Sequence, residues 1–548
     1  MSATSGNTCR KRMRRHPSIV FCSMFFHAWL VIWGWCLSYS ASTFAADPPL
    51  KTPHSITSAG ATSIGVKECA ACHSAPSPIY NFLGVTRFVR LVEAKEWLEQ
   101  DKHAYAYQLV RQDLKADELK KEERISNKLS MEITARLNWK FGDGKFEQKC
   151  LTCHVGMDAK ESIVERSNTI APEIEIQFGV QCESCHGPGS EYTKREHHQQ
   201  VSWRTKTPEQ KSELGMWDLS SPSTAAKVCL SCHLGDIDAG RFVTHDMYAA
   251  GHPVLPPFDL QVFLSAMPPH WKTLQEKPTF EKSAEYNRAH FDIPGNTDEI
   301  QLAIRGSYDR TRRSMIGGLV ANDLGIELIH RGAADPKTWG DYSIYNCMGC
   351  HQELKKNSTQ VTRESRTPGR PFPANWLNLE YPRIHATNRE THETLTREML
   401  SSFNSVPFGD ALRIHQLSER HLQSLSDRFQ DRRKMERQVM TKKDVLQWLE
   451  YLIASRNDSL TDFWVAKQTA WMVCVAMDEL VKNEPLANEW VSPMRDELRD
   501  LLHLDLQLPQ QQSVLTVQKS MLGTAQNFDS ARCKELLNRL VEKAISNQ

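Results

Sequence analysis

Residues 182–189 of this chain read Cys-Glu-Ser-Cys-His-Gly-Pro-Gly, and the first five are one of five copies of the pattern Cys-x-x-Cys-His. The thiols of the five copies are Cys69, Cys72, Cys150, Cys153, Cys182, Cys185, Cys229, Cys232, Cys347 and Cys350, and the histidines that end them are His73, His154, His186, His233 and His351. Two cysteines at this spacing, followed directly by histidine, form the attachment site of c-type haem. The sequence therefore predicts five covalently bound haem c groups with their iron.

The histidine after each second cysteine gives the pattern its specificity. The two thiols bind the haem vinyl groups as thioethers, and the histidine then reaches the iron as its first axial ligand. Zinc knuckles also use Cys-x-x-Cys pairs, but zinc takes four ligands and needs no histidine at that position in every copy. A thioredoxin-like redox site would occur once, after a strand. The repetition favours haem.

The N-terminal 46 residues have the pattern of a secretory signal peptide. Five of residues 10–15 are Lys or Arg, residues 19–37 form an apolar run rich in Phe, Trp and Val, and the mostly small residues Ser-Thr-Phe-Ala-Ala follow at 42–46. This order predicts cleavage after Ala45 or Ala46. An uncleaved anchor is the alternative, because the apolar run is long enough to span a bilayer. Both alternatives place the motifs outside the cytoplasm, and we expect the periplasm.

The charge balance argues against one class of partner. The chain has a net charge of +1, and removal of residues 1–46 takes away five basic residues and no acidic one, which leaves −4 (1 − 5). Haem propionates would add negative charge. Nucleic-acid binding needs a basic surface, so we expect no such partner. We expect a redox partner protein with a basic docking surface.

Composition divides the chain into a haem-binding part and a helical part. We expect a mainly α fold in which residues 47–354 form a pentahaem cytochrome c domain with long irregular loops, since haem plates supply much of its core. Residues 355–373, rich in Lys, Arg, Ser, Thr, Pro and Gly, are predicted to be a linker. Residues 374–548 are predicted to form a helical bundle. Helical periodicity also occurs at 94–113 and 299–331.

Two apolar stripes in the C-terminal part predict buried helix faces. They are formed by Val445, Trp448, Leu449, Leu452 and Ile453, and by Cys533, Leu536, Leu537, Leu540, Val541 and Ala544. Ser459 and Asp462 resemble a capping pair before the next helix. Cys474 and Cys533 both fall on core-facing positions. They could form a disulfide or remain two separate buried thiols.

A haem iron that transfers electrons usually takes a second axial ligand, most often histidine or methionine. Five histidines that lie close in sequence to a motif are the main candidates, namely His103, His197, His198, His245 and His252. A short connection to a fixed haem costs little loop-closure entropy. The sequence leaves the choice between residues 197 and 198 open. Further candidates are His270 and His330, while surface or core roles are expected for His54, His385, His392, His415, His421 and His503 and packing roles for Met247 and Met267.

The first four motifs resemble those of a known family. The likeness includes Cys69–His73 followed by Trp97 and His103-Ala-Tyr-Ala, then residues 150–155, 179–189 and 229–234. Over about residues 62–240 the chain resembles the multihaem c-type cytochromes related to the tetrahaem cytochrome that accepts electrons from hydroxylamine oxidoreductase. The resemblance implies closely stacked haem pairs, a mainly helical periplasmic fold and bis-histidine ligation, with His103 and either His197 or His198 as distal ligands.

The sequence departs from that family in three places. It has a fifth motif at Cys347–His351, the stretch Ala249-Ala-Gly-His252-Pro, and the helical C-terminal part. The second and third motifs are closest in sequence, which favours a close haem pair there.

We predict a pentahaem electron carrier whose partners include a membrane quinol-oxidising complex or a periplasmic oxidoreductase. We expect electron transfer rather than catalysis, because all five motifs end in histidine. The alternative is a multihaem oxidoreductase that acts on a small nitrogen or sulfur compound at one iron with an open ligand position.

Overall fold

The computed structural model shows a mainly α-helical chain, as the sequence predicts. The structure describes residues 61–76, 89–110, 121–140, 143–156, 178–273, 276, 291–293, 295–335, 339–351, 373–374, 377, 389–405, 408–423, 432–506, 523–525 and 527–547. The predicted signal peptide and, apart from Pro373, the predicted linker lie outside the described residues. Among the described helices, none has the length and apolar character that a membrane span requires.

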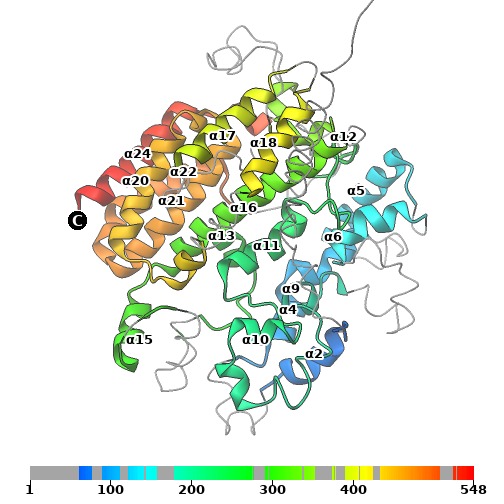
Figure 1. Cartoon of the computed structure of the whole chain (residues 1–548), viewed down its shortest axis with the longest axis vertical. Helices are drawn as coiled ribbons and strands as arrows, with labels where there is room; N and C mark the ends of the chain where they lie inside the picture. Colours follow the sequence, from blue (N-terminus) through cyan, green and yellow to red (C-terminus); the bar gives the residue numbers. More distant parts are fainter. Residues whose placement is uncertain are drawn as a thin grey trace, which may run out of the picture. The chain divides into compact units, whose positions relative to one another are not determined.

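Short helices alternate with irregular connections in the first half of the chain (Figure 1). In order they are α2 (Val66–His73), α4 (Glu93–Gln100), η3 (Lys102–Leu109), α5 (Lys121–Leu137), η5 (Glu147–Leu151), α6 (Thr152–His154), α9 (Cys182–His186), η7 (Val201–Thr205), α10 (Pro208–Ser212), α11 (Pro222–His233), α12 (His245–Ala250) and α13 (Leu260–Ala266). Extended pairing in the described residues is limited to two isolated bridges, Asp236 with Arg241 and Tyr345 with Pro373.

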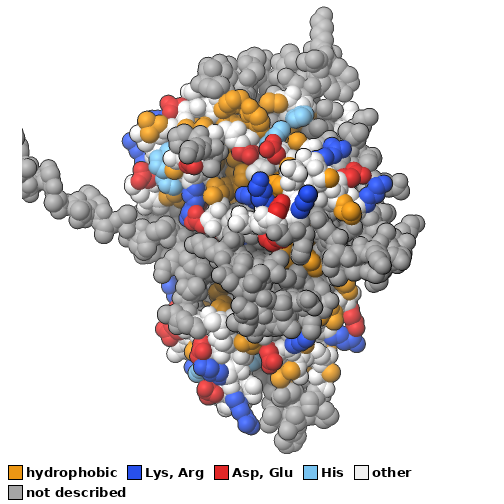
Figure 2. All heavy atoms as spheres, turned by 90° about the vertical axis from the view of Figure 1, so that its right-hand side faces the viewer, with side chains coloured by type: hydrophobic (Ala, Val, Ile, Leu, Met, Phe, Trp, Pro, Cys, Tyr) orange, Lys and Arg blue, Asp and Glu red, His pale blue; other side chains and the backbone are white. Residues whose placement is uncertain are grey.

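Among the described residues, the second half contains most of the long helices, together with four short 3-10 segments. In order, its elements are α15 (Thr297–Arg305), α16 (Asp309–Ala334), η8 (Tyr342–Ile344), η9 (Cys347–Gly349), α17 (Arg389–Ser402), α18 (Ala411–Gln423), α20 (Lys442–Arg456), η11 (Ser459–Thr461), α21 (Phe463–Asn483), η12 (Pro485–Ala487), α22 (Asn488–Leu502) and α24 (Ser530–Ser546). Figure 2 shows that basic and acidic side chains are interspersed over the described part of one face.

Helices α20, α21, α22 and α24 lie side by side and enclose one apolar core (Figure 1). Both predicted apolar stripes are confirmed as buried faces, on α20 and on α24. Asp462 caps α21 by accepting hydrogen bonds from the backbone N–H groups of Trp464 and Val465, so the predicted capping role holds for this residue. Cys474 and Cys533 are free thiols that lie near each other in the structure, and the disulfide between them stays a prediction.

Two segments with continuous helical periodicity are each broken in the structure. The segment at 94–113 stops being α-helical at Asp101, whose carboxylate accepts the backbone N–H of His103 and starts the 3-10 segment η3. The segment at 299–331 is interrupted between α15 and α16, where Tyr308 N–H donates to the carbonyl of Met440 instead of continuing the helix. Hydrophobic periodicity reports which residues are buried; it records neither the cap at Asp101 nor the long-range bond from Tyr308.

Helix α16 lies between the haem-binding part and the C-terminal helices. Its buried residues belong to three apolar clusters: Met315 packs with α20 and α21, Ile326 with α18, and Val320 with α11. The close approach of α16 to α13 depends on a glycine, because a Cβ atom added at Gly317 would lie 2.6 Å from the Cβ of Leu260. The two predicted parts therefore share one helix.

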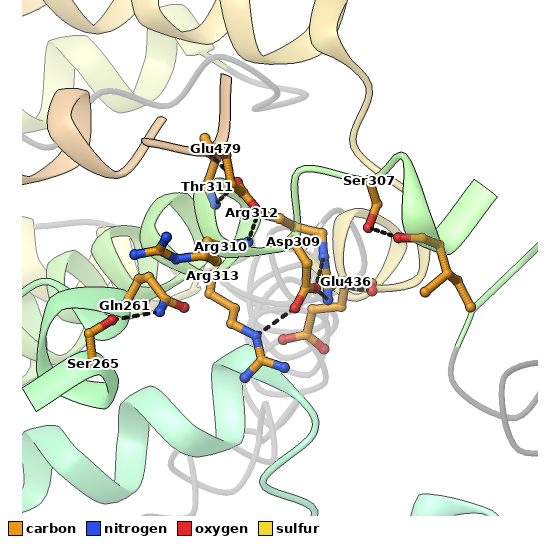
Figure 3. A network of polar contacts seen from close by, with 11 residues as sticks. Gln261, Ser265, Ser307, Asp309, Arg310, Thr311, Arg312, Arg313, Glu436 and Glu479 are labelled. Atoms are coloured by element: carbon orange, nitrogen blue, oxygen red, sulfur yellow. Dashed lines mark hydrogen bonds and ion pairs between the residues drawn. The ribbon is translucent and has the colours of Figure 1, made fainter. Parts of the chain in front are cut away.

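Buried polar contacts fix the first turn of α16 (Figure 3). The Glu479 carboxylate on α21 accepts the backbone N–H groups of Arg310 and Thr311 at 2.9 and 2.8 Å, and the Thr311 hydroxyl at 2.8 Å. Beside it, Asp309 pairs with Arg312 and Arg313. Burial opposes ionisation of Asp309, but the two guanidinium groups hold its pKa well below the usual value. Helix N-termini leave unpaired N–H groups, and Glu479 supplies their acceptor from another helix.

Candidate haem centres

The motifs lie on helical segments, and thiols of the first four motifs lie close to one another in pairs. The first and third motifs are on α2 and α9, and the thiols of Cys69 and Cys182 are within hydrogen-bonding reach of each other. The second and fourth motifs are on α6 and α11, where Cys153 and Cys232 are similarly close. The thiol pairs thus join first with third and second with fourth, although the second and third motifs are the nearest in sequence.

Glu183, inside the third motif, joins that motif to the first. Its carboxylate accepts the backbone N–H groups of Ile64 and Gly65, just before α2, at 3.0 and 2.8 Å, and that of Gly189 at 2.6 Å. Gly187 takes a φ of 83°, and a Cβ there would lie 2.2 Å from the carbonyl oxygen of Gly215. These contacts give a physical reason for the sequence Cys-Glu-Ser-Cys-His-Gly-Pro-Gly.

Arg241 joins the second motif to the fourth in a comparable way. This buried guanidinium donates to the carbonyl oxygens of Thr152 and Gly156 at 2.8 and 3.3 Å, and to the hydroxyl of Ser231 at 3.1 Å. Thr152 lies within the second motif and Ser231 within the fourth. The planar guanidinium group has five N–H donors that point in different directions, so it can bind these three acceptors at once.

Three motif histidines face a second histidine at a similar separation. The ring centroids are 5.9 Å apart for His73 and His198, 6.2 Å for His233 and His103, and 6.5 Å for His351 and His245. Metal–imidazole bonds are about 2 Å long, so two imidazoles on opposite sides of one metal ion place their centroids about 6 Å apart. The described side chains therefore fit an iron with two axial histidines at the first, fourth and fifth motifs.

The remaining two motif histidines also have a histidine nearby. His252 lies close enough to His154, and His270 close enough to His186, for one charge to depress the pKa of the other imidazole. Burial is the larger cause, and it lowers the pKa of His186, His233 and His252 to about 4. Neutral imidazole is the form that binds a metal.

Hydrogen bonds at Nδ1 orient several of these rings. Carbonyl oxygens accept from His154, His252 and His270, and carboxylates accept from His73 and His103. A ring that donates from Nδ1 presents the lone pair of Nε2, and metal-binding histidines are held in this manner.

The structure places the five main distal candidates differently. His103, His198, His245 and His252 each come near a motif histidine, whereas no ring contact of His197 with a motif histidine occurs among the described residues. The ring of His198 packs edge-on against those of Tyr192 and Trp203, with centroids 6.4 and 5.9 Å away.

The two further candidates for distal ligands, His270 and His330, have different surroundings. His270 lies near the third motif, although it follows the fourth motif in sequence and no local pattern connects it to the third. His330 stacks on His415 with centroids 4.1 Å apart, too close for an iron between the rings. His392 and His421 are buried between α17 and α18, in the core role expected of them.

Comparison with known proteins finds one family model that matches part of the chain. Residues 68–187, which include the first three motifs, match the family model described as cytochrome c554 and c-prime. The match supports a multihaem c-type cytochrome with covalently bound haem c and a role in electron transfer. No curated protein and no solved structure matched the chain. The fourth and fifth motifs lie outside the matched residues.

Proposed function

We propose that this chain is a periplasmic pentahaem c-type cytochrome that carries electrons between redox partners. One observation carries the proposal: three of the five motif histidines, His73, His233 and His351, face a second histidine at ring separations of 5.9 to 6.5 Å. The other two have a histidine near enough for their charges to interact. Haem c supplies one-electron chemistry. Two strong axial ligands leave an iron no position for a substrate, so this arrangement favours electron carriage over catalysis.

The positions of the thiols support electron transfer along the chain. Cys69 lies beside Cys182, Cys153 lies beside Cys232, and Cys229 is close enough to Cys185 to help raise the pKa of the Cys185 thiol. Each thiol would hold one edge of a macrocycle. Groups attached at the first four motifs would therefore lie near one another, as electron hopping requires.

The net charge of the carrier predicts the charge of the surface to which it docks. Without residues 1–46 the chain has a net charge of −4 (1 − 5), and propionates would make it more negative. A donor or acceptor with a basic docking surface suits it, because complementary charge speeds the encounter of two proteins. A membrane quinol-oxidising complex and a periplasmic oxidoreductase are the two partner classes that we propose. Hydroxylamine oxidoreductase belongs to the second class through the family resemblance.

Mass spectrometry and electron paramagnetic resonance of the purified, oxidised protein test this proposal. The mass should correspond to the chain cleaved near residue 46 and carrying five covalent haems, and every haem should give a low-spin signal. A smaller haem number would contradict the pentahaem proposal. A high-spin signal that shifts on addition of nitrite or hydroxylamine would instead favour the oxidoreductase.

Neighbouring histidines provide a matched pair of variants. His198→Ala should convert one haem towards high spin, because the ring opposite His73 is lost. His197→Ala removes the same side chain one residue earlier and should leave the spectrum unchanged. Electron paramagnetic resonance of both variants is the measurement. An unchanged spectrum for His198→Ala would show that this ring binds no iron.

A further inference from the structure

Helix α4 has a carboxylate at each end, and each one accepts a hydrogen bond from an imidazole that faces a haem site. At its first residue, Glu93 Oε2 lies 2.9 Å from Nδ1 of His73. Directly after its last residue, Asp101 Oδ1 lies 3.0 Å from Nδ1 of His103. His73 belongs to the first motif, and His103 faces His233 of the fourth motif. One short helix therefore contacts a candidate ligand at two haem sites.

Both carboxylates are held in place by the local structure. Glu93 also accepts the backbone N–H of Arg90 at 2.7 Å, and Asp101 accepts that of His103 at 2.9 Å. Their side chains are only 17% and 2% exposed, so water competes weakly for them. Trp97, in the middle of α4, packs in one apolar cluster with residues of α2 and η3. The two contacts are therefore fixed parts of the fold.

A backbone carbonyl oxygen is the acceptor for His154 of the second motif, for His252 near it, and for His270 near the third motif. Nδ1 of His154 lies 2.9 Å from the carbonyl oxygen of Ala106, and Nδ1 of His252 lies 2.8 Å from that of Pro253. Nδ1 of His270, near the third motif, lies 3.1 Å from the carbonyl oxygen of Pro268. A carbonyl is a dipole, whereas a carboxylate carries a full negative charge. The N–H proton is drawn more strongly towards the carboxylate, and Nε2 becomes a stronger electron donor.

We infer that Glu93 and Asp101 lower the reduction potentials of the haems at the first and fourth motifs relative to those at the second and third. A more basic ligand and a nearby negative charge both stabilise ferric over ferrous iron, and hydrogen bonding to axial ligands is a recognised control of haem potential. The inference rests on the proposed function, since it requires both imidazoles to bind iron. Electrons entering the chain then settle preferentially on the second and third haems. Glu93 and Asp101 are positioning residues, because they act through histidine.

Glu93→Gln and Asp101→Asn test the inference by removing charge while keeping an acceptor oxygen. Glu99→Gln is the matched control: it removes the same charge from the same helix, but Glu99 is exposed and its ion pair is with Lys95. Redox titration followed by optical spectroscopy measures each haem. In each test variant one haem should become easier to reduce, with a reduced-to-oxidised ratio about tenfold higher at a fixed ambient potential. For one electron this ratio corresponds to about 59 mV.

The outcomes separate this inference from the proposed function. If the unaltered protein lacks five low-spin haems, the proposed function fails, whatever the variants do. If it has them and both test variants titrate like the control, the inference alone is overturned. A high-spin haem in Glu93→Gln would also overturn it, because the carboxylate would then only hold the ring in place. The two variants act on different haems, so misfolding of one leaves the other informative.

Discussion

At the scale of single residues, charged side chains hold the motifs together by forming hydrogen bonds, mostly to backbone groups. In a sheet, backbone groups of neighbouring strands would bind each other directly. The Glu183 carboxylate accepts backbone N–H groups from residues 64, 65 and 189 and so holds α2 against α9. Arg241 connects the second and fourth motifs through three acceptors. Buried backbone groups need partners, and in short irregular segments side chains must supply them.

Replacement of this carboxylate should therefore lower stability. Glu183→Gln leaves one acceptor oxygen and turns an NH2 group towards backbone donors, so we expect a loss of about 1–3 kcal/mol in the free energy of unfolding. Glu191→Gln is the control, because the carboxylate of this half-exposed residue pairs with Lys194 at 2.5 Å and contacts neither α2 nor Gly189 through an ion pair in the described part of the chain. Chemical denaturation of both variants is the measurement. Equal midpoints for the two would contradict the role given to Glu183.

The histidines show what the sequence can and cannot predict at this scale. The motif histidines follow from a local pattern, and His103 and His198 come near motif histidines although neither belongs to a motif. His270 is one of the further candidates, and it comes near His186 only through the path of the chain between them, which no local pattern records. His197 and His198 are adjacent, and the local path of the backbone decides which of the two side chains points towards His73. The amino-acid sequence alone does not predict that direction.

At the scale of elements, buried helix faces could be predicted but helix ends could not. The apolar stripes of α20 and α24 depend on a period that a short window of sequence contains. The break at Asp101 depends on one capping bond, and the start of α16 depends on Glu479, which lies 168 residues from Thr311. Acceptors so distant in sequence leave no local signal.

The carboxylate at the start of α16 predicts a pH dependence. Burial raises the pKa of Glu479, and the hydrogen bonds from Arg310 and Thr311 only partly oppose this. A folded-state pKa above the unfolded value means that the folded protein binds more protons. This stability contribution is therefore full below the unfolded pKa and is lost as pH rises through the folded pKa.

Glu479→Gln removes that titration and isolates its effect. The stability of the variant minus that of the unaltered protein should increase as pH rises from about 4.5 towards neutrality, since only the unaltered protein loses the contribution. Denaturant unfolding at several pH values measures the difference. Asp444→Asn, at the exposed capping position of α20, is the control and should show no such rise. A difference that falls over this range would reverse the sign and contradict the assignment.

At the scale of the whole molecule, α16 connects the predicted haem part to the predicted helical part. Val320 packs in a cluster with Leu230 of α11, the helix that carries the fourth motif, while Met315 packs in the cluster that contains α20, α21 and α24. The division at residues 355–373 remains a prediction, since that segment lies almost entirely outside the described residues. A shared central helix predicts that the two parts unfold together.

A variant far from every motif tests this coupling. Leu540 on α24 is fully buried in the C-terminal core, and Leu540→Ala should cost about 2–5 kcal/mol in the free energy of unfolding. Helical circular dichroism and the haem Soret band should then shift to the same lower midpoint, because one cooperative unit reports equally through both probes. Leu412→Ala, at an exposed position of α18, should shift neither. If Leu540→Ala moves the helical signal and leaves the Soret transition in place, α16 does not couple the parts and the haem domain unfolds alone.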